Sequence, residues 1–527
     1  MNNKMGVWCM NKVAGKRIFA SILCVNLVFL YAPIGVFASE ISGVNPTGNV
    51  YNIEAAQVSG QTGFRHYNKF NLTKGDIANL IYTNTYSKFV NLVDNQININ
   101  GLVQTLKDGN FYNGHAIFVS PNGMVIGASG VFNVGSLSVL TPTQAKFNDL
   151  LHAYDGELTY HLSDYEYGAD KYNGLIKDSQ GNIIVNGKII AKEEVNLYGG
   201  NIQIGDGQNK AGIIAGVNNN PKYENANSAS LAFDNLVSNN VKDIENYELE
   251  NGKIKIVANK RYGFDSGNEK NLVASVDINK ADIGANEIDI SATSEVDRQQ
   301  KVDLARANVD IQNSNITGDT VSITAKASQK KSFDMANPVE DAEFIINTLE
   351  DIVLTPDSDA PPVTSLWGVA GKAEAEVNIH NSNINALGKT PSDSQNPNMS
   401  VTISAEASSE TSENANFLTP TIVDFLFNDD SHLDEYFSSD IYNGFEGARS
   451  SAIVDITNST IKAAGDNSGN IEISTDASSS FIEKVLSDVI TVEFSLFETA
   501  VTSISPLVAF KIEFLTVALD TVSEPTP

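Results

Sequence analysis

The sequence predicts an all-β protein, specifically a right-handed parallel β-helix with inserted helical or irregular segments, and three observations support this. Short segments alternate apolar and polar residues with the period of two typical of a strand with one buried face. The same pair of segments recurs along the chain, and polar turns rich in asparagine join the pair. One such pair offers a single layer of apolar side chains, so it becomes stable only by stacking on other copies, as in a solenoid.

The repeated unit consists of two strands, each present four times. The first has the form Ala-x-Val-Asp/Asn-Ile, and a polar turn followed by an isoleucine leads to the second. Alternation places valine and isoleucine on the buried face and the acidic or amide residue on the outer face. The first strands span 274–278, 307–311, 375–379 and 452–456, and the second span 288–292, 321–325, 401–405 and 471–475.

Asparagine opens the turn in three copies, at Asn313, Asn381 and Asn458, whereas the first copy has Lys280 there. Asparagine tolerates left-handed backbone conformations, and amides stacked in register can hydrogen-bond to one another. We therefore expect these residues to form the corners of successive coils.

Extra material separates the later copies, because the valines of the first strand stand 33, 68 and 77 residues apart. Insertions at one point of a coil lie on one side of a solenoid. Residues 342–354 and 481–490 place apolar side chains at helical spacing. They fit helical flaps over the shaft, or alternatively receptor-binding or membrane-active elements. The last insert does not return to a strand copy, so we expect the chain to be part of a longer protein.

The first 38 residues have the features of a secretory signal peptide. Basic residues precede an apolar run over 18–32, and Val36-Phe37-Ala38 provides small residues at the positions that a signal peptidase reads. We expect cleavage after Ala38. A retained N-terminal anchor is the alternative, although the apolar run is short for a membrane span.

Composition excludes several classes of protein once that leader is removed. Both cysteines, Cys9 and Cys24, lie within it, so the mature chain has no disulfide or thiolate chemistry. Loss of four basic residues takes the net charge from −29 to −33, with no basic patch, which argues against a nucleic-acid partner.

A more aromatic module follows the leader. Its first block runs from Gly63 to Leu72 and contains Tyr67-Asn68-Lys69-Phe70-Asn71. Its second block runs from Asn113 to Gly127 around Ser120-Pro121-Asn122-Gly123. Proline fixes one backbone angle, and asparagine and glycine accept positive φ, so this second block predicts a tight turn between two strands.

The order and spacing of these blocks resemble the secretion domain of two-partner secretion exoproteins, the group that includes filamentous haemagglutinin. That family has an aromatic Phe-Asn segment, then Asn-Pro-Asn-Gly-Ile, then a Val-Gly stretch. Here they correspond to Tyr67 through Leu72, to Ser120 through Met124, and to Phe132 through Leu137. Ser120 and Met124 depart from the family's Asn and Ile. The repeat style is similar to leukotoxin-type filamentous adhesins.

The resemblance implies a function and a partner. After export to the periplasm, a dedicated outer-membrane barrel transporter with periplasmic docking domains would recognise the module and pass the chain outward. A host-cell receptor or glycan would be a further partner. Under this hypothesis the recognition surface is shaped by Phe70, Asn71, Ser120, Pro121, Asn122 and Gly123. The competing interpretation is that each of them only maintains the turns.

No catalytic residues, cofactor or metal site are expected. The six histidines lack metal-ligand spacing, and no phosphate-binding loop or nucleophile elbow occurs. The alternative enzyme is a calcium-dependent β-helical polysaccharide lyase, but Asp277, Asp310 and Asp455 recur at outward strand positions. Five tyrosines within 154–172 could contact a carbohydrate or pack as a cap.

The predicted organisation therefore has five parts. They are a signal peptide (1–38), a secretion domain (39–145), a β-helix continuation with insertions (146–270), a repetitive β-helix with inserted flaps (271–480) and an incomplete insert (481–527). The predicted function is that of a secreted or surface-exposed adhesin or toxin-like exoprotein.

Overall fold

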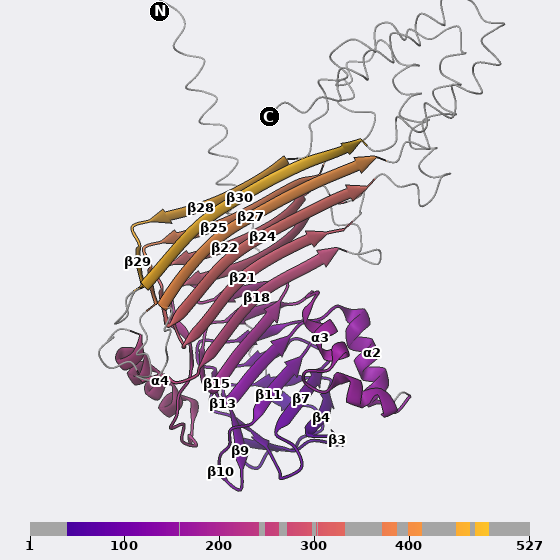
Figure 1. Ribbon diagram of the computed structural model, residues 1–527. Coiled ribbons are helices and arrows are strands. Elements are labelled where there is room, and N and C mark those ends of the chain that lie inside the picture. Colours follow the sequence, from indigo (N-terminus) through magenta and orange to yellow (C-terminus); the bar gives the residue numbers. More distant parts are fainter. Residues whose placement is uncertain are drawn as a thin grey trace, which may run out of the picture.

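The computed structural model describes a subset of the 527 residues. The described ranges are 39–157, 159–241, 248–262, 271–297, 302, 304–332, 371–386, 399–413, 449–463 and 469–483. The predicted signal peptide, the helical segment expected at 342–354 and the chain beyond 483 lie outside them. The fold is mostly β, with large sheets of parallel strands, and this confirms the all-β class (Figure 1).

One sheet runs the length of the molecule. Its first neighbours, β1 and β5, are antiparallel, and every later neighbour is parallel. In spatial order the strands are β1 (Glu40–Ile41), β5 (Phe70–Leu72), β8 (Ile97–Ile99), β12 (Met124–Ile126), β14 (Asn182–Val185), β16 (Asn201–Ile204), β19 (Asn271–Asn279), β22 (Leu304–Gln312), β25 (Lys372–His380) and β28 (Arg449–Thr457).

Two further columns of parallel strands run through the second half of the chain. The short column contains β17 (Ala211–Ala215), β20 (Ala281–Gly284), β23 (Asn315–Gly318), β26 (Asn383–Ala386) and β29 (Thr460–Ala463). The long column contains β18 (Lys253–Tyr262), β21 (Glu287–Val296), β24 (Thr320–Ser332), β27 (Met399–Glu413) and β30 (Gly469–Glu483), which lie side by side in Figure 1.

The first half of the chain also has two columns of parallel strands, and both columns lead into the same two long strands. One contains β2 (Val50–Ile53), β6 (Ile77–Ile81) and β9 (Leu102–Lys107), and the other β4 (Thr62–Tyr67), β7 (Lys88–Val93) and β11 (His115–Val119). Both continue into β13 (Val131–Leu140) and then β15 (Lys188–Gly199). The short strands β3 (Gln57–Ser59) and β10 (Asn110–Phe111) pair antiparallel with β4 and β9.

The core lies between the columns, and the predicted alternation positions it. Val276, Val309 and Val377 are opposite one another on neighbouring strands and are all fully buried. The acidic and amide residues between them point outward. The register of the repeat copies is therefore as the sequence predicted.

The corners also follow the prediction. Asn313, Asn381 and Asn458 have φ values of 51°, 49° and 49°, and Lys280 has 59°. Serine extends the corner contacts, because Ser314 N donates to Ser382 Oγ at 3.1 Å and Ser382 N donates to Ser459 Oγ at 3.1 Å. Each corner is thus tied to the next coil by side-chain as well as backbone bonds.

Helices cover two outer faces of the sheets. The first cover consists of α2 (Gln144–Tyr154), the 3-10 helix η1 (Thr159–Tyr165) and α3 (Asp170–Ile176), which pack over β4, β7 and β11. The second is α4 (Ala226–Asn240), whose apolar residues pack on β15 and β17 (Figure 1). None of the helices within the described ranges is long and apolar enough to traverse a lipid bilayer.

The expectation of a helix over 481–490 is wrong at its start. Phe481 and Ile482 belong to β30, which pairs in parallel with β27 through Thr411 and Ser412. The preceding coil offers a strand edge of that length, so ladder hydrogen bonds outweigh the local helical spacing. The insert boundary proposed at 481 therefore falls inside a strand.

Candidate recognition surface

The segment Ser120–Gly123 forms the predicted turn between β11 and β12. Gly123 N donates to Ser120 O at 3.2 Å, and Gly123 has φ of 83°. The expectation that Asn122 also adopts positive φ is wrong, because Gly123 alone does so within this turn. A Cβ on Gly123 would overlap the carbonyl oxygen of Asn182 in the next coil, so glycine is needed for close stacking.

This turn sits directly on the preceding corner. Asn122 Nδ2 donates to Asp94 O at 2.6 Å, and Ser120 Oγ donates to Asn95 O at 3.0 Å. Asn122 is exposed, whereas Ser120 and Pro121 are buried. Asn122 is therefore the residue of this turn that a partner protein could contact directly.

The corner beneath has an asparagine at the equivalent position, with different partners. Asn95 Nδ2 donates to both the carbonyl O and the side-chain Oδ1 of Asn68, each at 2.8 Å. Both asparagines are exposed. On the inner side of this ladder, His66 Nε2 lies 2.8 Å from Asp94 Oδ1. The exposed corner of the first three coils is thus a column of amides, which we call the asparagine corner: Asn68, Asn95 and Asn122.

Two of the predicted residues lie next to this corner but differ in role. Phe70 is fully buried, with its ring 5.3 Å from those of both Tyr67 and Phe118 in edge-to-face geometry. Phe70 is therefore core. Asn71 is half-buried and accepts a hydrogen bond of 3.0 Å from Asn98 Nδ2 on the neighbouring strand. The structure brings all six predicted residues to one region, yet it leaves only Asn71 and Asn122 with access to solvent.

Asn68 and Asn95 also belong to this surface, although they were not among the residues predicted from the sequence. The signal was present, because Asn68, Asn95 and Asn122 are spaced by 27 residues, as are Asn71 and Asn98. A constant interval of that size marks one coil. The aromatic residues of this module obscured the interval, because they interrupt the Val-x-Ile alternation seen later in the chain.

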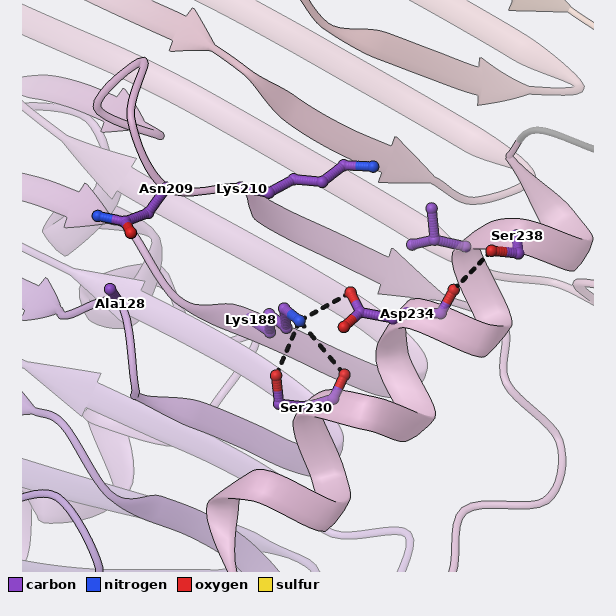
Figure 2. A pocket seen from close by; sticks show the side chains of 8 residues that line it. Ala128, Lys188, Asn209, Lys210, Ser230, Asp234 and Ser238 are labelled. Atoms are coloured by element: carbon purple, nitrogen blue, oxygen red, sulfur yellow. Dashed lines mark hydrogen bonds and ion pairs between the residues drawn. The ribbon is translucent and has the colours of Figure 1, made fainter.

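Other groups of chemical interest are occupied by structural contacts. A hollow of about 500 Å³ lies beside α4 and is lined by Lys188 and Asp234 (Figure 2). Lys188 Nζ donates to Ser230 Oγ at 2.8 Å and to Asp234 Oδ1 at 2.7 Å, and it lies over the ring of Phe233. This lysine fastens α4 to β15 and is not available to an incoming anion.

His115 is buried under the first helical cover. Its Nε2 lies 2.8 Å from Ser138 Oγ, and its ring packs against that of Tyr167 at 4.6 Å. Burial, together with the nearby Lys88 ammonium, lowers the pKa of His115 to about 3, so the ring is neutral at pH 7. Within the described ranges, no three histidine, cysteine, aspartate or glutamate side chains are grouped to hold a metal ion.

The tyrosines of 154–172 form a packed cover over the sheet. Tyr165 and Tyr172 are buried, and Tyr154 and Tyr167 pack against the same cluster, while Tyr160 is 75% exposed. Four of the five therefore stabilise the cover. Asp277, Asp310 and Asp455 lie on the outward face as expected, with Asn378 between the last two.

No protein-family model matches this chain, and no curated protein matches it significantly.

Proposed function

We propose that this chain is a secreted or surface-exposed filamentous adhesin or toxin-like exoprotein, and that its first coils direct export through an outer-membrane barrel transporter. The asparagine corner carries this proposal: three exposed amides at a 27-residue interval lie next to the residues that resemble the two-partner secretion motif. The role proposed for them is recognition by the transporter's periplasmic docking domains. No catalytic step or cofactor is part of it.

The fold supports the same proposal. We infer a right-handed parallel β-helix from three columns of parallel strands that share one buried interior. In such a fold each coil hydrogen-bonds to the one before it, so coils can form in sequence as the chain emerges. Folding outside the membrane would then oppose backward movement and favour export without a nucleotide.

The geometry of the corner suits recognition by a protein strand or loop. Asn68, Asn95 and Asn122 occupy equivalent positions beside neighbouring parallel strands, which are spaced by roughly 4.8 Å, and all three are exposed. Amide side chains offer both donors and acceptors, so such a column can bind an extended backbone. Asp94, paired with His66, adds an acidic group beside it.

The experiment separates recognition from folding by choice of variant. Asn122→Ala removes an exposed side chain, while Asn383→Ala removes a comparable one from a later corner, where Asn383 Nδ2 donates to Asn315 Oδ1 at 2.8 Å. Both variants should remain folded by circular dichroism. We expect Asn122→Ala to reduce export several-fold and Asn383→Ala to leave it near the parent level.

Equal export of the two variants would contradict a recognition role for the corner. Gly123→Ala is the reference for structural failure, because its Cβ overlaps the next coil. Loss of export in that variant should coincide with loss of the folded state.

A further inference from the structure

Ser39, the first residue after the expected cleavage position, is held by a compact polar network. Its Oγ donates to Asp76 Oδ2 and lies 2.9 Å from Thr73 Oγ1. Thr73 N donates to Ser39 Oγ at 2.7 Å, and Thr73 Oγ1 donates to the same Asp76 oxygen at 2.6 Å. Ser39 is thereby fixed to the segment between β5 and β6.

The strand that follows Ser39 closes one end of the core. β1 pairs antiparallel with β5, and Ile41 is only 3% exposed. Ser42 N donates to Lys69 O at 3.0 Å, while Lys69 Nζ and Glu40 Oε2 form an ion pair of 3.0 Å. Because β1 has only two residues, its attachment depends strongly on what holds its ends.

Among the residues that the structure describes, the last strand of the stack has no comparable cover. Ile471 and Ile473 of β30 are 44% and 50% exposed, although their counterparts Val401 and Ile403 in the preceding coil are fully buried. Within the described ranges, a short antiparallel strand of this kind covers the first strands of the stack.

Cleavage after Ala38 would place a new charge inside this network. Peptide-bond hydrolysis leaves an α-amino group on Ser39, which is protonated at neutral pH. The α-nitrogen and Oγ of a serine are separated by only two carbons. Since Oγ is bonded directly to Asp76, the new ammonium group would lie close to that carboxylate, and a small rotation of the free chain end could bring the two into an ion pair.

We propose that removal of the leader creates a salt bridge between the Ser39 α-ammonium and Asp76, and that this bridge locks β1 over the first coil. The inference rests on the proposed function, because it takes the chain to be exported and processed at Ala38. Its consequence is that processing and capping are coupled: the uncleaved chain has the hydrogen bonds of Ser39 but not the charge. The anchor is thus completed only in the mature protein.

The neighbouring ionisable groups leave Asp76 as the partner. Tyr51 Oη donates to the carbonyl oxygen of Ser39 at 3.4 Å and is uncharged at neutral pH. Glu40 and Lys69 pair with each other on the adjoining strands. The hydroxyl of Thr73 donates to Asp76 and contributes no charge.

The test compares two forms of the mature chain, residues 39–527, one with a free Ser39 amino group and one with that group acetylated. Acetylation removes the charge and keeps the side-chain contacts. We expect amide hydrogen exchange at Ser42 to be about two- to fivefold slower in the free form, the range of a partly exposed ion pair. Asp76→Asn should abolish the difference between the two forms, because both then lack the charge pair.

The pH dependence gives a second measurement on the same proteins. Pairing raises the pKa of the amino group in the folded state, so the extra protection is present below its unfolded value near 8 and is lost as the pH rises above it. Equal rates of amide exchange in the free and acetylated forms at pH 6 would overturn the proposed salt bridge between Ser39 and Asp76, which we call the clamp. A difference between the two forms that persists in Asp76→Asn would overturn it as well.

Mass analysis of the exported chain distinguishes the clamp from the proposed function. A mature chain that begins at Ser39 supports the clamp. A different first residue would overturn it and leave dependence on the transporter as a separate question. Export without a transporter would contradict the proposed function, whereas the exchange comparison on purified chains would still decide the clamp.

Discussion

Ile403 and Ile473 occupy the same position in consecutive coils, and they provide a matched pair for measuring the effect of stacking. Ile403 lies opposite Ile323 on one side and Ile473 on the other, and it is fully buried. Among the described residues, Ile473 has a strand neighbour on one side only, and it is 50% exposed. Replacement of each by alanine removes the same atoms, once from a fully buried site and once from a half-exposed site.

The expected cost differs accordingly. Ile→Ala at a fully buried site typically lowers the free energy of unfolding by about 2–5 kcal/mol, because lost apolar transfer is added to the cavity left behind. At Ile473 roughly half the transfer contribution remains and there is no closed cavity, so we expect a loss of about 1 kcal/mol. The difference between the variants should therefore be at least about 1 kcal/mol.

Urea denaturation followed by far-UV circular dichroism measures both costs. The slope of the unfolding free energy against urea should match the parent's, so that midpoints can be compared. Equal losses in the two variants would refute the argument that a coil is stabilised by neighbours on both sides. A greater loss of unfolding free energy in the Ile473 variant than in the Ile403 variant would contradict that argument more strongly.

Three further predictions concern the corner, the turn and the buried histidine. Asn381→Ala should cost about 1 kcal/mol in thermal or urea unfolding, because φ at this position is 49°, while Asn381→Gly should cost little. Gly123→Ala should destabilise the first coils far more than Asn122→Ala, as read from hydrogen-exchange protection of β8 and β12. His115 binds a proton more weakly in the folded chain than in the unfolded chain. Its contribution to the free energy of unfolding is therefore complete above about pH 6.5 and declines as the pH falls towards 3, with roughly 2 kcal/mol lost by pH 5. His115→Gln should flatten that acid slope; an unchanged slope would contradict the assignment.

The repetitive half of the fold could be predicted because its signals are local and repeated. The valines at 276, 309, 377 and 454 align in register, and the corner asparagines have the expected backbone conformation. A period of two residues determines which side chains face inward, and identical corners determine where each coil turns. Local patterns were therefore sufficient to predict this part.

Other features depend on tertiary contacts that no short pattern records. β1 is a two-residue strand, too short to show alternation, and it exists because β5 offers an edge beside Ser39 and Thr73. α4 is anchored by Lys188 and Phe233, whose partners lie on separate elements. In the candidate surface, Asn122 was identified from its motif, whereas Asn95 required knowledge of which coil it lay on.

Export of the chain with and without its barrel transporter tests the central claim most directly. The assay would express the chain in cells that carry a candidate outer-membrane barrel transporter and in cells from which that barrel has been deleted, and compare the amount of folded chain outside the cell. Our account predicts extracellular or surface-exposed chain with the barrel present, and periplasmic accumulation or degradation without it. Similar amounts outside the cell in both strains would contradict the proposed function.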